Sequence, residues 1–218
     1  MKKRINNKVV LRTLENVTFE KACTEEDFTN KEFSENPKNK IYLDFVLFDS
    51  CRFVNIDFSL LHIEKLSFIN CEFKSCVFKN GTTSKASFYT CDFLNSKIEN
   101  LILSSCQMEK IRFINLSSKY FSLTSCYLKD ISFIDSLLRE VTFQDNKSEN
   151  ISFSSCQLYE NEFFHTSFLG TDFSSSLIEG IRIDLDSIRG ATFSRDQGLE
   201  LVKMLGVNIK QEELWLTI

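Results

Sequence analysis

Large apolar residues recur at every fifth position along most of this chain. From Phe28 to Phe193, 34 positions lie at this spacing, and 30 of them hold a large apolar residue. They include 18 of the 22 Phe, whereas chance would place a fifth of them there. A period of five fits neither an α-helix nor a flat strand, so the chain must change direction within each repeat. The exceptions are Lys38, Thr83, Ser118 and Ser148.

The residue two places before each of these positions forms a second inward column. It is mostly small or apolar, and seven of the eight Cys lie in it, as small buried hydrophobic residues would. The other three positions of each repeat are mostly polar or charged. Two inward and three outward residues in every five describe a chain that turns a corner at each repeat. The Cys of this column are Cys51, Cys71, Cys76, Cys91, Cys106, Cys126 and Cys156.

A longer period of 20 lies on top of the period of five. One residue in every 20 is always Phe, whereas the other three columns mix Phe with other residues. This sorting predicts a four-sided coil of 20 residues in which equal rings stack on equal rings. The predicted structural core is Phe33, Phe53, Phe73, Phe93, Phe113, Phe133, Phe153, Phe173 and Phe193.

The position two after each core residue is predicted to be the corner. It holds many Asn, with Ser, Asp and three Gly, and these residue types tolerate a left-handed backbone best. Corners of this kind explain how a chain with only one Pro and six Gly can turn so often.

These features resemble the pentapeptide-repeat family, whose motif is a small residue, Asp or Asn, Leu or Phe, Ser or Thr, and then Gly or a polar residue. Residues 91–95 (Cys-Asp-Phe-Leu-Asn) and 171–175 (Thr-Asp-Phe-Ser-Ser) match it closely, and the resemblance covers residues 19–193. It implies an all-β protein, a right-handed quadrilateral β-helix of about 8 coils of 20 residues. The pattern weakens from Ser34 to Tyr42, around Pro37, where we expect a protruding loop or an irregular coil.

Three segments are predicted: an N-terminal cap segment (1–22), the β-helix (23–193), and a C-terminal helix and tail (194–218). Ser194 and Gln197 have the spacing of a capping box, so a short helix should run from about Asp196 to Leu205. Gly206 would end it.

The C-terminal helix and tail carry more apolar residues than one face needs. They either cap the last coil of their own chain or form a two-fold dimer contact. Residues 198–209 resemble the C-terminal segment of the Qnr-type quinolone-resistance and microcin B immunity proteins, and this resemblance implies a homodimer. The predicted interface residues are Leu199, Val202, Leu205, Val207 and Ile209.

No candidate chemistry stands out. His62 and His165 fall at outward positions about five coils apart, and no Cys-x-x-Cys occurs. We therefore predict no catalytic, metal-binding or cofactor-binding residues, no cofactor and no enzyme activity. With no readable signal peptide and no apolar run long enough to span a membrane, we expect a cytoplasmic protein with reduced thiols and no membrane partner.

Four successive corners are acidic: Asp130, Asp135, Glu140 and Asp145. They are either ordinary soluble corners or part of a partner-facing surface that imitates a phosphate backbone. Residues 23–193 hold 24 Asp and Glu against 17 Lys and Arg, and with this sign of net charge we expect no direct nucleic-acid binding. B-DNA of the same length, about 40 Å, would carry about 24 negative charges, so the net charge of −7 of these residues matches that of DNA only weakly.

The resemblance to the Qnr group implies a DNA mimic that binds DNA gyrase or topoisomerase IV and changes sensitivity to quinolones or toxins. The alternative is a structural or protein-interaction scaffold with an unrelated partner. Resistance proteins of that group carry two loops that interrupt the repeats. Here the register is unbroken, so any loop must be a multiple of five long, and Gly81 to Lys85 and Asn146 to Asn150 are the candidates.

Overall fold

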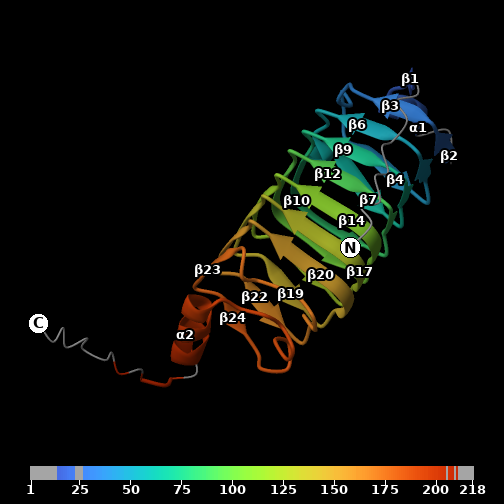
Figure 1. The fold of residues 1–218 in the computed structure, drawn as a ribbon. Helices are drawn as coiled ribbons and strands as arrows, with labels where there is room; N and C mark the ends of the chain where they lie inside the picture. The colour runs from blue at the N-terminus through green and yellow to red at the C-terminus, as the bar shows by residue number, and fades with distance from the viewer. Residues whose placement is uncertain (1–13, 23–26, 205, 209, 211–218) are drawn as a thin grey trace, which may run out of the picture.

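The computed structural model describes residues 14–22, 27–204, 206–208 and 210. The chain winds into a single rod of stacked coils, with the N-terminal coils at one end and helix α2 at the other (Figure 1). Strands pair in parallel with the strands 20 residues further on, so that Phe53 pairs with Phe73 and Phe113 with Phe133. The predicted β-helix with a 20-residue coil and a short C-terminal helix is therefore confirmed.

Each coil has four sides, numbered here from the side that carries the predicted Phe core. The fourth and first sides form one 12-stranded sheet. Its strands are β1 (Glu15–Asn16), β2 (Asp27–Thr29), β3 (Lys31–Phe33), β5 (Leu47–Asp49), β6 (Arg52–Val54), β8 (Ser67–Ile69), β9 (Glu72–Lys74), β11 (Ser87–Tyr89), β12 (Asp92–Leu94), β14 (Gln107–Ile114), β17 (Tyr127–Ile134) and β20 (Lys147–Ser154).

The second and third sides form a 10-stranded sheet and a separate pair, β4 with β7. The larger sheet contains β10 (Val77–Ser84), β13 (Lys97–Ser104), β15 (Ser117–Lys119), β16 (Ser122–Thr124), β18 (Leu137–Arg139), β19 (Thr142–Gln144), β21 (Gln157–Tyr159), β22 (Glu162–Phe164), β23 (Leu177–Glu179) and β24 (Arg182–Ile183). The pair is β4 (Ile41–Asp44) and β7 (Leu61–Glu64), and a 3-10 turn, η1 (Phe58–Leu60), lies on the second side.

The Phe column of the first side is the structural core, as the 20-residue period predicts. Its rings stack at centroid separations between 4.5 and 5.3 Å. Eight of the nine are buried. Phe193 is only partly buried, because among the described residues no further ring of the column stacks beyond it. A second stack, from Phe28 to Phe88 on the fourth side, meets the first edge-to-face.

The predicted corners are confirmed. Every non-Gly residue with a positive φ in the described part of the chain has a number divisible by five, and their φ values lie between 48 and 59°. Asn is the commonest residue there, but Phe45 and Tyr120 adopt the same conformation although bulky residues rarely do. The coil geometry, and not local preference alone, therefore imposes the corner.

The second inward column ties successive coils together. The Cys51 thiol donates to the carbonyl of Phe28 in the coil before it. Where Ser replaces Cys the same bond persists, as from Ser96 to Phe73, and the Ser96 hydroxyl also accepts from the Cys76 N–H. Buried polar residues such as Ser96 are thus tolerated because they satisfy backbone groups of neighbouring coils, whereas the buried Ser118 Oγ has no hydrogen-bond partner among the described residues.

The N-terminal end departs from the regular coil. Strand β1 pairs with β3 at a 16-residue offset, Glu15 with Lys31, so this turn is shorter than the others. Helix α1 (Phe19–Ala22) places the Phe19 ring 4.7 Å from Phe33, so that Phe19 covers the end of the Phe column. The predicted cap segment thus contains a residue that closes the core.

The segment predicted to be irregular, from Ser34 to Tyr42, is irregular up to residue 40, and Ile41 and Tyr42 already belong to β4. No strand forms between residues 34 and 40, although the register on both sides stays at 20: Phe33 pairs with Phe53 and Ile41 with Leu61. The Asn36 side chain replaces a strand contact by accepting from the Asp57 N–H at 2.7 Å.

Neither of the two predicted loop positions is a loop, and this expectation was wrong. Thr83 lies in β10 and pairs with Leu103, and Ser148 lies in β20 and pairs with Leu128. A small residue in the apolar column does not expel the backbone from the sheet, because the ladder hydrogen bonds do not depend on that side chain.

Helix α2 (Arg195–Met204) follows the last coil, within one residue of the predicted bounds. Its capping box is present: the Ser194 N–H donates to the Gln197 Oε1 at 2.8 Å, and the Gln197 N–H donates to the Ser194 Oγ at 3.3 Å. Gly206 has a φ of 76° just beyond the helix, as a C-terminal glycine does. None of the helices in the described residues has the length and hydropathy needed to span a bilayer.

Candidate protein-binding surface

Charge is divided unevenly along the rod. Residues 27–129, the N-terminal coils, contain 11 Asp and Glu and 13 Lys and Arg, for a net charge of +2. Residues 130–193, named here the acidic coils, contain 11 Asp and Glu but only 4 Lys and Arg, for a net charge of −7. The net charge therefore changes from positive to negative along the rod at Asp130. The net charge of all the repeats taken together does not show this division.

The four predicted acidic corners do not form one site. Because they are successive corners of one coil, they lie on four different edges of the rod. Asp130 accepts from the Asn150 side chain at 2.9 Å, Asp145 contacts the His165 Nδ1 at 2.8 Å, and Glu140 lies 3.7 Å from the Lys119 Nζ. A partner on one face of the rod can reach only some of the four.

A different set of carboxylates lines a single edge. Glu140 and Glu160 are stacked corners 20 residues apart, and the Glu160 N–H donates to the carbonyl of Glu179 at 2.8 Å in the next coil. The three are named here the glutamate edge. Glu160 and Glu179 are exposed and have no ion pair among the described residues. The backbones of Glu140 and Glu160 are therefore about 4.8 Å apart along the rod, and Glu179 lies one residue before the next corner, Gly180, in register with Tyr159.

The backbone does not explain why glutamate occupies these corners. Glu140 and Glu160 have φ values of 51° and 53°, a conformation that costs a non-glycine L-residue about 1 kcal/mol and that Asn adopts more easily. Stacking like charges adds a further repulsion. The predicted acidic corners are successive corners five residues apart, a spacing that does not identify this edge. The 20-residue period, applied to Glu140, leads directly to Glu160.

The predicted dimer residues lie at the C-terminal end of the rod. Leu199 and Val202 of α2 are 40% and 37% exposed, and Val207 beyond the helix is 50% exposed. Leu201 packs against the core instead. Leu205 and Ile209 lie outside the described residues. Leu199 and Val202 are therefore on the part of α2 that does not cover the last coil, and the exposed Val207 follows the helix.

The seven cysteines in the described part of the chain are buried free thiols. Burial raises the pKa of Cys51 to about 11 and that of Cys76 to about 12, because the low-dielectric interior disfavours a thiolate. Within the same residues, no three His, Cys, Asp or Glu side chains gather in a way that could hold a metal ion. These thiols act as packing and hydrogen-bonding groups.

Raised thiol pKa values predict a loss of stability at alkaline pH. In the unfolded chain the thiols ionise near their ordinary pKa of 9.0, whereas in the folded protein the pKa of Cys51 is about 11 and that of Cys76 about 12. Thiolate formation then favours the unfolded state, so the free energy of unfolding should fall as pH rises from 9.0 toward these values. Urea unfolding at increasing pH measures the fall, which should be smaller with Cys51→Ala and Cys76→Ala. Rapid alkylation of Cys51 or Cys76 in the folded protein at neutral pH would contradict their burial.

Comparison with known proteins finds only distant similarity. No protein-family model and no curated protein matches the chain. A solved structure of trypsin-treated QnrB1, a plasmid-mediated fluoroquinolone resistance protein, is 19% identical; the match covers 83% of this chain and all of that one, with a TM-score of 0.36. HetL, a pentapeptide repeat protein involved in heterocyst differentiation regulation from the cyanobacterium Nostoc sp. strain PCC 7120, is 13% identical, with 84% and 88% covered and a TM-score of 0.39.

Both matches are distant in sequence and in structure. The assignment rests on the chain itself: a five-residue repeat, a 20-residue register between parallel strands and a stacked Phe core. By these features the chain is a β-helix of the pentapeptide-repeat type.

Proposed function

We propose that this protein is a cytoplasmic DNA mimic that binds a type II topoisomerase, DNA gyrase or topoisomerase IV, and modulates sensitivity to quinolones or toxins. The supporting observation is the line charge of the acidic coils. Their 64 residues span roughly 15 Å of rod at about 4.8 Å per coil. B-DNA of that length carries about nine negative charges, and these coils carry a net charge of −7.

Only one part of the rod has this property. The N-terminal coils have a net charge of +2 and would be repelled from a groove that holds DNA. We therefore propose that the acidic coils enter the enzyme's basic groove, with the glutamate edge facing it. Complementary charge would mainly accelerate association, so binding should weaken at high salt.

Removing the glutamate edge should weaken inhibition of the enzyme. We expect a Glu140→Asn, Glu160→Asn, Glu179→Gln variant to need at least about tenfold more protein to inhibit DNA supercoiling by gyrase, since each exposed charge pair contributes up to about 1 kcal/mol. Its folding stability should be equal or higher, because Asn adopts the corner conformation more easily. Supercoiling is measured with purified gyrase, with and without ciprofloxacin.

A matched control removes three exposed carboxylates from the N-terminal coils: Asp27→Asn, Glu35→Gln and Asp44→Asn. It changes the net charge by the same amount but should leave inhibition unaltered. Equal losses in both variants would show that overall charge, and not the glutamate edge, is responsible. If the unaltered protein affects neither gyrase nor topoisomerase IV, the proposal fails and a scaffold for an unrelated partner takes its place.

We also propose that the chain is a homodimer joined through its C-terminal segment. The support is the exposure of Leu199 and Val202 on α2, next to the exposed Val207. Val202→Asp should convert a dimer into a monomer in sedimentation velocity, because it would bury a charge in the contact. Glu200→Gln, on the same helix, should leave the mass unaltered. A dimer that survives both Val202→Asp and Leu199→Asp would refute this contact.

A further inference from the structure

One coil of the rod is underfilled. Three of its inward positions hold small side chains, although the same positions in neighbouring coils hold larger ones. Gly81 stands between Leu61 and Leu101 in one column, Ala86 follows Leu66, and Thr83 precedes Leu103. All three small residues lie within six residues of each other, so the missing volume is concentrated in one place.

Gly81 is not required by the backbone. The corner glycines Gly170, Gly180 and Gly190 have φ values between 63° and 79°, but Gly81 lies in β10 without a positive φ. A Cβ added at Gly81 would meet nothing closer than 3.7 Å, the distance to the Leu101 Cδ1. Neither conformation nor close packing explains this glycine, so its effect is to leave space.

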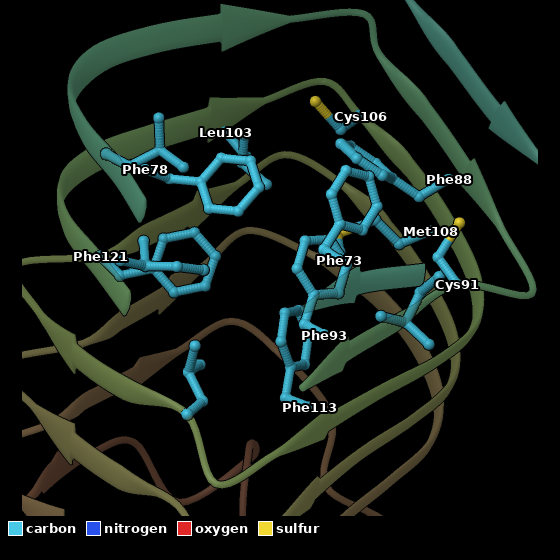
Figure 2. Close-up of a cluster of buried hydrophobic side chains, with 14 of the residues drawn as sticks. Phe73, Phe78, Phe88, Cys91, Phe93, Leu103, Cys106, Met108, Phe113 and Phe121 are labelled. Carbon is cyan, nitrogen blue, oxygen red and sulfur yellow. The ribbon is translucent and has the colours of Figure 1, made fainter. Parts of the chain in front are cut away.

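That space is a cavity of about 400 Å³ inside the rod. The Phe73, Phe93 and Phe113 rings stack in one column, and the side chains of Phe78, Leu103 and Phe121 lie across the space from them (Figure 2). Gly81 is exposed, whereas Leu61 and Leu101 on either side of it are 7% and 8% exposed. The cavity therefore opens to solvent at Gly81. Its apolar wall includes Phe78, Phe88, Phe93, Met108, Phe113 and Phe121.

The rim of this cavity is polar and carries two lysines. Lys40 and Lys79 line it, together with Ser59, Asn80 and Thr82. The Lys79 Nζ lies 4.0 Å from a Glu99 oxygen, and Glu99 also pairs with Lys97 at 2.7 Å, so Glu99 only partly offsets the charge of Lys79. An apolar interior below a cationic rim suits a ligand with an apolar body and an anionic head.

We propose that this cavity binds one medium-chain fatty acid, with its hydrocarbon chain among the Phe rings and its carboxylate at Lys40 and Lys79. The volume lies in the range of small-molecule sites, and apolar cavities of this kind accept apolar guests. The carboxylate stays at the rim because burying it among the rings would be costly. The site is separate from the acidic coils and does not depend on topoisomerase binding.

The test is calorimetric titration of the full-length protein with dodecanoate and with dodecanol. Dodecanoate should bind, and dodecanol should bind roughly fivefold more weakly, because it lacks the ion pairs at the rim. A Lys40→Ala, Lys79→Ala variant should bind dodecanoate roughly fivefold more weakly than the unaltered protein does, and its affinity for dodecanol should be unchanged. Equal affinity for both probes would overturn the assignment of an anionic head.

Filling the cavity separates binding from folding. Gly81→Leu, which copies Leu61 and Leu101, should abolish binding and raise Tm by at least about 3 °C, because the added side chain fills existing space. Thr142→Ile, an outward change on the same side of the rod, should alter neither property. Binding that persists in Gly81→Leu, or a native protein that binds neither probe, would overturn the proposal.

Discussion

Replacing Phe133 with alanine is expected to lower the free energy of unfolding by about 3 to 5 kcal/mol. Its ring is fully buried and stacks on Phe113 at 4.7 Å and on Phe153 at 5.2 Å, and it meets Phe143 edge-to-face at 6.0 Å. The substitution removes these contacts and leaves a cavity that the surrounding coils cannot close, because their spacing is held by the ladder hydrogen bonds. Urea unfolding followed by circular dichroism measures the loss.

Two companion variants show whether the stack is responsible. Ile134→Ala changes the next residue of β17, which is only half-buried, and should cost less than about 1 kcal/mol. Phe193→Ala removes a ring that, among the described residues, stacks on Phe173 alone, and it should cost less than Phe133→Ala. If Phe133→Ala cost no more than Ile134→Ala, the Phe column would not be the core.

Replacing Gln197 with leucine is expected to cost about 2 to 4 kcal/mol, although Gln197 lies in the first turn of a short terminal helix. Its side-chain amide is buried and donates to the carbonyls of Phe173 and Ser176 at 2.9 and 2.6 Å. Its Oε1 also accepts from the Ser194 N–H. Leucine has a similar size but would remove the donors to both carbonyls and the acceptor of the Ser194 N–H, and only the Phe173 carbonyl would keep another donor, the Ser176 N–H at 2.9 Å. Urea unfolding again measures the effect.

Gln197→Glu distinguishes the two roles of this residue. Glutamate serves a capping box as well as glutamine does, so the variant should be harmless if Gln197 acts only within α2. A carboxylate cannot donate to the carbonyls of Phe173 and Ser176, so it should destabilise at least as much as leucine if Gln197 closes the last coil. A stable Gln197→Glu protein would therefore refute the closing role.

Much of this architecture follows from the sequence alone. The five-residue period and the 20-residue recurrence of Phe33 to Phe193 predict the coil, the core and the corners. They do so because many equivalent repeats show the same pattern, so that one irregular repeat does not change the assignment of the others. The capping box of Ser194 and Gln197 is likewise local, since both partners lie within four residues. The two predicted loops did not form for the opposite reason. Thr83 and Ser148 break the apolar pattern locally, but their backbones still pair with residues of the adjacent coils, and this pairing cannot be seen within one repeat.

The candidate sites depend on contacts between coils. Glu140, Glu160 and Glu179 form one edge because residues about 20 apart become neighbours, whereas successive corners such as Asp130 and Asp135 face different directions. The second role of Gln197 requires the end of the last coil beneath it. The cavity at Gly81 requires that the neighbouring coils do not close over a missing side chain. Each of these features depends on which residues of adjacent coils become neighbours and on the spacing between the coils, and both are set only in the folded rod.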